Sequence, residues 1–384
     1  MRAVNGTGIF LHTGLGRAPI SAALVDRLAR EAAGYVVLEV DPATGERAHR
    51  ERGVVEILKK ISGAEAGTIV NNNAAAVLLA ASTLAAGGEV IVSRGELVEI
   101  GGGFRIPEVI ACSGARLCEV GTTNRTTIED FEAAITSETA LLMRIHTSNF
   151  KILGDGSLPA REDVVALGRK RSIPVVEDLG GGLIDRYGFD LFAEEPTVRE
   201  AIAQGVDVVT FSGDKLCGGP QAGVILGRRE SVEAMRANSL FRAVRPDKLT
   251  LALLEQTFAC YAGGAGELPD LPFFRALSEQ GGPLRERAAR LVERLSSEIP
   301  SFRFHIERSE AFAGSGSVPA EPVRSWAVAV TAPDVKAQRL SRRLRMGTPP
   351  VFATLKGDEV RIDMFALMSG DEEAIVEAFR GLSR

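Results

Sequence analysis

The amino-acid sequence predicts an α/β fold with a large, mostly parallel-sheet domain and a smaller α+β C-terminal domain. Between about residues 66 and 228, short β-branched runs alternate with helical stretches, a pattern typical of parallel strands joined by helices. Beyond that region a charged helix and separate strands indicate an α+β arrangement. With 384 residues, 45% of them hydrophobic, the chain is long enough to bury two cores.

The elements of the large domain are predicted from local composition. Short apolar runs predict strands at 67–70, 89–92, 116–120, 140–145, 173–178, 207–211 and 223–226. Helical spacing of apolar residues predicts helices at 74–85, 127–135 and 162–171. Ligands of such sheets bind beyond the carboxyl ends of the strands. The first functional candidates are therefore the polar residues that directly follow strands: Asn71, His146, Asp178 and Ser212.

The later elements set the predicted domain boundaries. A long helix is expected over 242–262, beginning near Pro246. It is followed by a charged helix at 283–299 and by strands at 327–331, 351–355 and 359–362. We therefore predict a large domain at 1–245 (with an N-terminal arm, 1–20, near the active site), a connecting helix at 246–265 and a small domain at 266–384.

Composition limits the classes of function. A net charge of −5 and a pI near 5.7 argue against tight, sequence-independent nucleic-acid binding by the bulk of the chain. No RNA-binding module is visible, and the sequence holds one tryptophan and three tyrosines. The start has no apolar signal region, and no apolar run reaches the roughly 18 residues of a membrane helix. We expect no membrane partner.

The cysteines indicate a reducing compartment. Cys112, Cys118, Cys217 and Cys260 show neither metal-ligand spacing nor the density of a disulfide-stapled domain. The sequence therefore predicts a cytoplasmic protein without a metal site.

Lys215 and Asp178 carry the main chemical hypothesis. Lys215 ends a polar turn after an apolar strand and precedes a glycine pair, and Asp178 closes another apolar strand. A lysine amine can form a Schiff base with an aldehyde, and an acid can pair with a pyridinium nitrogen. Pyridoxal phosphate requires both groups of its protein. Taken singly, Lys215 is also compatible with a surface lysine and Asp178 with a turn cap; their joint occurrence favours the cofactor.

Two further motifs fit a phosphate and a ring. The Asn71–Ala76 segment joins a strand to a helix, so backbone N–H groups at Asn72, Asn73 and Ala74 are candidates to bind the cofactor phosphate. The alternative is an ordinary asparagine N-cap. Ser212 is a candidate to donate its hydroxyl to the same phosphate, or is simply a turn serine.

Other polar groups are candidates for the ring and for an anion. The ring of His146 is placed to stack on the cofactor, and Asn149 to hold its phenolic oxygen; a lone histidine is more often a packing residue. Arg17, Arg242 and Arg245 are candidates to clamp a phosphate-like anion, because a guanidinium binds such groups bidentately. The alternative for each arginine is solvated surface charge.

The motifs resemble those of the bacterial selenocysteine synthase (L-seryl-tRNA(Sec) selenium transferase) family. The match is dense over roughly residues 4–260 and weaker at 314–319 and 348–351. The strings that carry it include Asn5-Gly-Thr-Gly8, Leu11-His-Thr-Gly-Leu-Gly-Arg17, Val70-Asn-Asn-Asn-Ala-Ala-Ala-Val-Leu-Leu79, His146-Thr-Ser-Asn149, Glu177-Asp-Leu-Gly180, Phe211-Ser-Gly-Asp-Lys215 and Gly218-Gly-Pro-Gln-Ala-Gly223.

The resemblance implies a fold-type I pyridoxal phosphate-dependent transferase. Lys215 is then the Schiff-base lysine and Asp178 the pyridinium partner, and Arg17, Arg242 and Arg245 match arginines that hold the selenium donor. The implied reaction converts seryl-tRNA(Sec) to selenocysteinyl-tRNA(Sec) with selenophosphate, through an aminoacrylate, for selenoprotein biosynthesis. Family members are homo-oligomers built from dimers.

One feature of the resemblance leaves a second function open. Family members carry an N-terminal tRNA-binding domain before the Asn-Gly-Thr-Gly region, which here begins at residue 5. The sequence is therefore expected to lack that domain. The alternative function is a pyridoxal phosphate-dependent lyase or transferase that acts on a small amino acid or amino sugar and does not use tRNA.

Overall fold

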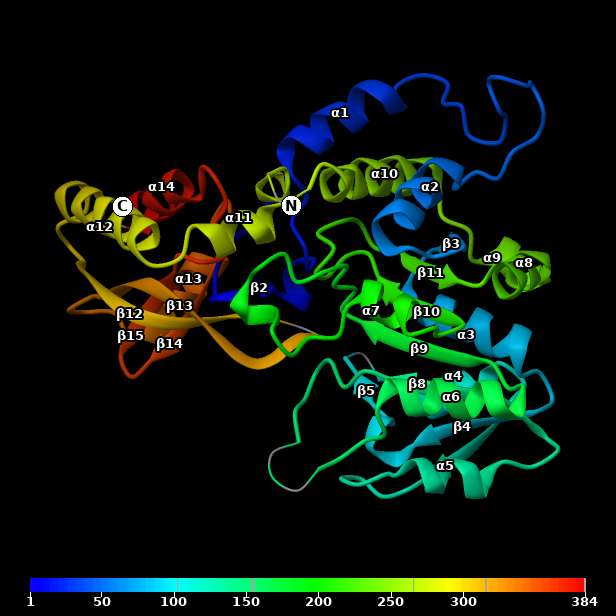
Figure 1. The fold of residues 1–384 in the computed structure, drawn as a ribbon. Coiled ribbons are helices and arrows are strands. Elements are labelled where there is room, and N and C mark those ends of the chain that lie inside the picture. Colours follow the sequence, from blue (N-terminus) through cyan, green and yellow to red (C-terminus); the bar gives the residue numbers. More distant parts are fainter. Residues whose placement is uncertain (102, 153, 155, 265, 315, 383–384) are drawn as a thin grey trace. The chain divides into compact units, whose positions relative to one another are not determined.

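The computed structural model describes residues 1–101, 103–152, 154, 156–264, 266–314 and 316–382. Residue 265, the end of the predicted connecting helix, and residue 315, within the 314–319 match, lie outside the described residues, as do 383 and 384. The chain divides into two compact units (Figure 1). The large unit comprises 20–268 and 316–319, and the small unit comprises 1–19, 269–315 and 320–384.

The large unit is built on a seven-stranded sheet with the order β3-β11-β10-β9-β8-β4-β7. Its strands are β3 (Ala66–Val70), β4 (Glu89–Ser93), β7 (Arg116–Val120), β8 (Thr139–Ile145), β9 (Val175–Gly180), β10 (Val208–Ser212) and β11 (Gly223–Gly227). Every strand predicted in this region is present. All neighbouring pairs are parallel except those of β11, which runs antiparallel to β10 and β3.

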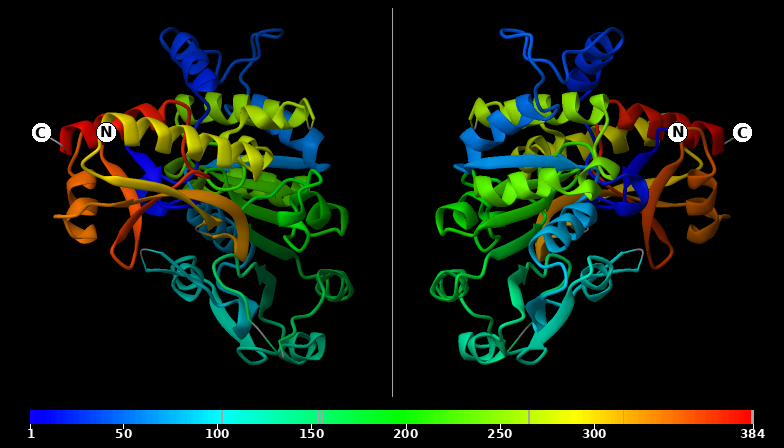
Figure 2. Two further views of the ribbon diagram at one scale, coloured as in Figure 1. Left: turned by 90° about the vertical axis from the view of Figure 1, so that its left-hand side faces the viewer. Right: turned by 90° about the vertical axis from the view of Figure 1, so that its right-hand side faces the viewer.

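Helices cover both faces of this sheet: α3 lies on one face and α6 and α7 on the other (Figures 1 and 2). The remaining elements of the unit are short or peripheral. The bounds are α1 (Ala22–Ala32), α2 (Arg52–Ser62), α3 (Asn73–Leu84), α4 (Ile106–Cys112), α5 (Ile128–Ala134), α6 (Arg161–Arg171), α7 (Val198–Ala203), α8 (Arg229–Ala237), β5 (Glu99–Ile100) and β6 (Phe104–Arg105).

The predicted helix over 242–262 is two helices in the structure. They are α9 (Ser239–Ala243) and α10 (Lys248–Ala262). Pro246 explains the break, because proline lacks an N–H group and disfavours helical backbone in the residue before it. Asp247 then starts α10 as its N-cap, accepting hydrogen bonds from the N–H groups of Leu249 (2.7 Å) and Thr250 (3.1 Å).

The small unit contains a six-stranded sheet with the order β1-β14-β15-β13-β12-β2. Its strands are β1 (Val4–Gly6), β2 (Ile9–Leu11), β12 (Arg303–Gly314), β13 (Ser317–Thr331), β14 (Val351–Lys356) and β15 (Glu359–Asp363). Its helices are α11 (Pro272–Ser278), α12 (Gly282–Glu298), α13 (Ala337–Arg345) and α14 (Asp371–Leu382).

The units differ from the predicted domains at the N-terminus and at two internal segments. Residues 1–19, which were assigned to the large domain, belong to the small unit. The reason is strand pairing: β1 lies parallel to β14, and β2 lies parallel to β12. Conversely, residues 316–319 belong to the large unit, and so does α10. No helix among the described residues is long and apolar enough to cross a membrane.

Candidate active site

Lys215 lies in a tight turn directly after β10. Its side chain is buried, with a residue exposure of 4%. The turn is closed by backbone hydrogen bonds from Gly213 to Ala222 (2.9 Å) and from Gly218 to Lys215 (3.0 Å). Gly218 adopts a φ of 70°, which favours glycine, so the first glycine of the pair after the lysine suits this turn. The sequence therefore folds this lysine inward rather than onto the surface.

Asp178 lies on β9, the strand beside β10, where it pairs in register with Thr210. Its Oδ1 accepts hydrogen bonds from Asn73 Nδ2 (2.7 Å) and from the N–H group of Gly180 (2.9 Å). Burial raises the pKa of Asp178, although Asn73, Gly180 and the nearby charge of Lys215 act in the opposite direction. A cationic N–H group bound to this carboxylate would favour its ionised form.

The N-terminus of α3 reaches the same carboxylate. Asn72 is its N-cap and accepts a hydrogen bond from Ala75 N–H (2.9 Å), as the ordinary-cap alternative predicts. Asn73 contacts Asp178, and the backbone N–H groups of Asn73 and Ala74 lie in the first turn, where the helix dipole favours an anion. Gly223 leaves room for this segment, since a Cβ there would collide with Asn72 O.

The structure also places His146, Asn149 and Ser212. The backbone N–H group of His146 donates to Asp178 O (2.8 Å), so the histidine lies beside the acid. Its Nε2 is 3.3 Å from Glu195 Oε1, without hydrogen-bond geometry. Ser212 is the buried last residue of β10. Asn149 is exposed, and its Nδ2 donates to Glu99 O (2.8 Å).

Unsatisfied buried polar atoms indicate that this site fits a polar cofactor. Asn73 Oδ1, His146 Nε2 and Ser317 Oγ are buried and have no hydrogen-bond partner among the described residues. Buried polar groups normally have such partners, so unpaired ones mark a place for a ligand. An inward-facing amine, a buried carboxylate and a helix N-terminus are also the groups that pyridoxal phosphate requires. The residues present therefore fit this cofactor.

The tip of the β12–β13 hairpin contributes residues that sequence reasoning missed. A Cβ at Gly316 would lie 2.6 Å from Lys215 Nζ and 3.5 Å from Ser148 Oγ. Ser317 follows and is 2% exposed. The only signal in the sequence is the Gly-Ser-Gly-Ser string at 314–317, and it lies about a hundred positions after the lysine.

The three candidate arginines differ in their burial and in the unit to which they belong. Arg242 is exposed on α9, and Arg245 is half-buried, with its Nη1 3.8 Å from Glu39 Oε1. The segment between these two arginines contacts the residues that precede α3. There the N–H group of Asn71 donates a hydrogen bond to Val244 O (2.8 Å). Arg17, with a φ of 62°, belongs to the small unit, so its relation to Lys215 stays a prediction.

Gly316→Ala is expected to impair the site without unfolding the protein. The new Cβ would displace Lys215 Nζ, and the φ of 69° adds roughly 1–2 kcal/mol of backbone strain. We expect cofactor affinity to fall about tenfold or more. Titration of the visible absorbance with pyridoxal phosphate measures this loss.

Gly357→Ala is the matched control for this variant. Its φ is 58°, so the strain is comparable, but its Cβ would have no atom within 4 Å. Equal cofactor affinity in the two variants would contradict a specific role for Gly316 beside Lys215.

Comparison with known proteins identifies the family. The model of the family described as "L-seryl-tRNA selenium transferase" matches residues 3–368. The chain belongs to the L-seryl-tRNA selenium transferase family. It is 42% identical over 384 residues to the L-seryl-tRNA(Sec) selenium transferase of Clostridium botulinum (strain Okra / Type B1), covering 99% of this chain and 82% of that protein. The enzyme of the same name from Alkaliphilus metalliredigens (strain QYMF) is 43% identical over 382 residues, with the same coverage.

A solved structure resembles this selenium transferase family member over its whole length. The structure of D-glucosaminate-6-phosphate ammonia-lyase matches with a TM-score of 0.67 and 20% identity, covering 100% of this chain and 95% of that chain. At this identity the likeness concerns the fold alone. It confirms the predicted α/β, fold-type I architecture.

Proposed function

We propose that this chain converts seryl-tRNA(Sec) to selenocysteinyl-tRNA(Sec), with pyridoxal phosphate as cofactor and selenophosphate as selenium donor. The observation that carries the proposal is the buried pair of Lys215 and Asp178 at the ends of neighbouring strands, in a chain of this family. Relatives at 42–43% identity over 99% of the chain bear the name of this activity. No specific observation favours the alternative, a lyase or transferase that does not use tRNA.

Each cofactor-binding role is assigned to a group that the site presents. Lys215 Nζ holds the cofactor aldehyde, and Asp178 holds the proton of the ring nitrogen. The N–H groups of Asn73 and Ala74, with Ser212, bind the phosphate, and Asn72 caps the helix that presents them. His146 borders the ring. Asn149, which donates to Glu99 O, would have to release that bond to reach the phenolic oxygen.

The protein supplies proton transfer and fixed positive charge. Bound pyridoxal phosphate provides an electron sink for the charge released when the seryl Cα loses its proton. Once the seryl amine has displaced Lys215 Nζ from the cofactor aldehyde, the freed lysine amine would accept that proton and return one to the departing β-hydroxyl, which leaves as water. Arg242 and Arg245 bind the oxyanion of selenophosphate, and Arg17 joins them if the small unit brings it there. Cationic groups fixed in this way stabilise developing negative charge.

We also propose that the protein forms homo-oligomers built from dimers and that it acts in the cytoplasm. Exposed apolar side chains in the N-terminal part of the large unit support association. They are Val25 on α1 and, after it, Tyr35, Val37 and Val40, all at least 44% exposed. Exposed apolar side chains are common at protein–protein contacts when they lie together on the surface.

Arg242→Ala is expected to separate cofactor binding from selenium transfer. The visible absorbance with pyridoxal phosphate should persist, because Arg242 is exposed and, within the described part of the chain, forms no hydrogen bond or ion pair with the Lys215 turn. Formation of selenocysteinyl-tRNA should fall about ten- to a hundredfold, since an anion loses a charge-assisted hydrogen bond of roughly 1.5–3 kcal/mol. Conversion of seryl-tRNA(Sec) with labelled selenophosphate measures the effect.

Arg171→Ala, at the end of α6, is the matched control, because this arginine pairs with Glu132 (2.9 Å) and has no proposed role. Unchanged transfer in Arg242→Ala would remove that arginine from the donor site. Failure of the unmodified chain to convert seryl-tRNA(Sec), despite bound cofactor, would refute the proposed function.

A further inference from the structure

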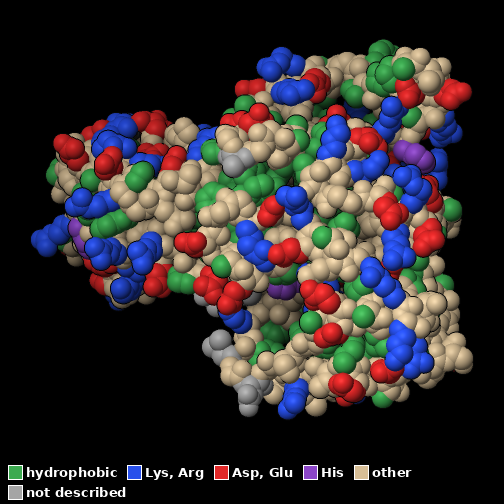
Figure 3. All heavy atoms as spheres, viewed as in Figure 1, with side chains coloured by type: hydrophobic (Ala, Val, Ile, Leu, Met, Phe, Trp, Pro, Cys, Tyr) green, Lys and Arg blue, Asp and Glu red, His purple; other side chains and the backbone are tan. Residues whose placement is uncertain are grey.

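The small unit has a hollowed, basic surface that the proposed reaction does not use. It has a volume of about 1070 Å³ and lies on its six-stranded sheet, beside the start of α12. The residues that define it, called here the Trp326 groove, are Arg285, Arg308, Phe312, Arg324, Trp326 and Lys356. Figure 3 shows basic side chains gathered over the strands of this unit, at the left of the view. The chain as a whole carries a net charge of −5, so the groove is a local exception.

Strand geometry explains why these side chains share one face. On β12 and β13, Arg308, Phe312 and Arg324 are exposed and Trp326 is half-buried. Residues between them on the strands, such as Ala311 and Ser325, are buried. Helices α12 and α13 pack on this sheet. The exposed positions of β12 and β13 are therefore left for charged and aromatic residues.

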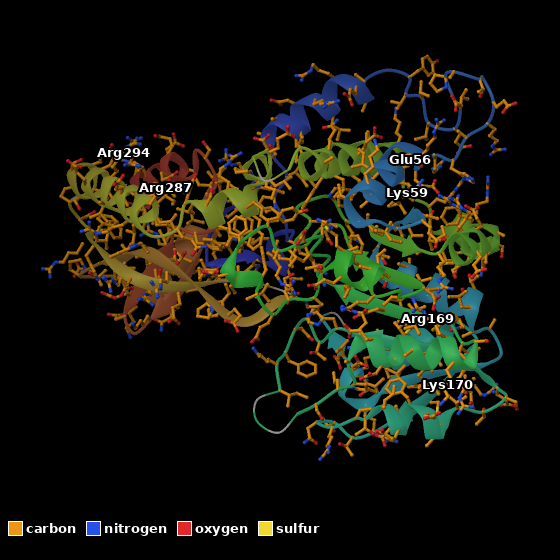
Figure 4. All side chains as sticks on the ribbon, viewed as in Figure 1. Glu56, Lys59, Arg169, Lys170, Arg287 and Arg294 are labelled. Atoms are coloured by element: carbon orange, nitrogen blue, oxygen red, sulfur yellow. The ribbon has the colours of Figure 1, made fainter. Side chains whose placement is uncertain are left out.

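The cations of the groove form no close ion pairs within the described part of the chain, although Lys356 interacts electrostatically with Glu307. Among the described residues, Arg285, Arg308, Arg324 and Lys356 have no carboxylate within ion-pair distance. Neighbouring arginines behave differently: Arg287 and Arg294 of α12 pair with Glu372 and Glu373 of α14 at 2.6 Å (Figure 4).

The acidic groups of the groove do not cancel this charge. Glu310 is exposed on β12, and Arg361 pairs with Glu307. Asp363 is buried, and its carboxylate accepts hydrogen bonds from Ser309 (2.6 Å) and Ser325 (2.8 Å). Burial raises the pKa of Asp363, and the hydrogen bonds from Ser309 and Ser325 act in the opposite direction. The basic side chains that line the groove outnumber Glu310 and Asp363, so its surface is net positive.

Trp326 supplies a stacking surface in the middle of these cations. The guanidinium carbons of Arg285 and Arg308 lie 5.6 and 5.8 Å from its ring centroid. Phe312, 38% exposed, lies on the same face. Proteins that bind single-stranded RNA combine cationic side chains for the phosphates with aromatic rings and arginine planes on which bases stack. The sequence did not reveal this combination, because Arg285 and Lys356 are distant along the chain and the strands that align the other members were not predicted.

We propose that the Trp326 groove binds a single-stranded segment of RNA, with phosphates on its unpaired cations and a base stacked at Trp326. The inference rests on the proposed function, which supplies an RNA substrate. The hollow, of about 1070 Å³, is open to solvent on the sheet, so an extended segment can lie along it. An acidic peptide would match the charge but would leave the aromatic rings unused.

Trp326 is the only tryptophan of the chain, so its fluorescence reports on the groove directly. The probe is an unstructured RNA of about ten nucleotides without an amino acid, titrated into the full chain. Polyphosphate at the same phosphate concentration is the comparison. We expect saturable quenching by RNA and little by polyphosphate, since only RNA has bases. Equal quenching by both, or none by RNA, would overturn the proposal.

The Arg308→Glu, Arg324→Glu double variant tests the cations. We expect its affinity for labelled RNA to fall at least tenfold and the salt dependence of binding to lose about 1.4 in log–log slope for two phosphate contacts. The control is Arg342→Glu with Arg345→Glu on α13, which makes the same charge change on exposed residues of the same unit. Equal losses in both double variants would contradict a specific groove.

Trp326→Ala tests stacking by the anisotropy of labelled RNA, and we expect a loss of about ten- to a hundredfold. Thermal unfolding of each variant identifies any that fails to fold. These measurements use no cofactor and no selenium donor, so their failure would leave the proposed reaction intact. If the unmodified chain binds RNA in this way but does not convert seryl-tRNA(Sec), only the proposed function fails.

Discussion

Replacement of Lys215 by alanine is expected to abolish covalent attachment of pyridoxal phosphate and to reduce selenium transfer by about 10²- to 10⁴-fold. The amine at this position both anchors the cofactor and moves the Cα proton in the proposed mechanism, and no other described lysine lies in the β10–β11 turn. Borohydride reduction followed by peptide mapping should give a pyridoxyl adduct on the Lys215 peptide of the unmodified chain. The variant should give none.

Lys170→Ala is the matched control. Lys170 lies at the end of α6 (Figure 4), and its Nζ pairs with Glu132 Oε1 at 2.8 Å. This variant should retain both the adduct and the activity. An unmodified chain that gave no adduct at Lys215 with ample cofactor would contradict the assignment of the site and the mechanism built on it.

Glu96→Gln is expected to stabilise the protein above neutral pH and to flatten its pH dependence. Glu96 is 4% exposed, and burial raises its pKa to about 7 from 4.5; the charge of Glu177 acts in the same direction and that of Arg144 opposes it. The folded state therefore keeps a proton that the unfolded state loses. The stability from this group is complete below pH 4.5 and is lost as pH rises to about 7.

A pKa shift of this size corresponds to about 3 kcal/mol. The neutral glutamine mimics the protonated acid, so the two proteins should unfold alike at pH 4 and differ by up to about 3 kcal/mol at pH 8. Denaturant unfolding at a series of pH values measures the difference. Glu230→Gln, an exposed change on α8, should leave the pH profile unchanged. A constant difference between Glu96→Gln and the unmodified chain at all pH values would contradict the prediction.

The success of strand prediction in the large unit follows from burial on both faces. β9 and β10 are buried along their whole length, so their sequences are mostly apolar and can be recognised without knowledge of the partner strands. The polar residues that interrupt such runs, Asp178 and Ser212, then stand out. The strand ends of a parallel sheet meet at one edge, which is why the Lys215–Asp178 hypothesis was accessible from the sequence.

The same approach found only parts of the small unit. β12 and β13 are twelve and fifteen residues long, but only 327–331 was predicted as a strand. β12 contains many charged and polar residues and only a short apolar run, Ala311–Ala313, because one of its faces is open. β1 and β2 have three residues each, which is too short for any periodicity. Their pairing with β14 and β12 moved the N-terminus to the other unit.

The sequence by itself determined the chemistry of each segment: an α/β unit, a lysine and an acid at strand ends, and motifs that resemble one family. Only the tertiary structure decided which distant segments meet. In the structure Gly316 lies beside Lys215, and Arg285, Arg308 and Lys356 line the same groove as Trp326. The reason is physical. Local composition fixes strands, turns and caps within a few residues, whereas contacts between segments depend on sheet pairing and burial, which involve the whole chain.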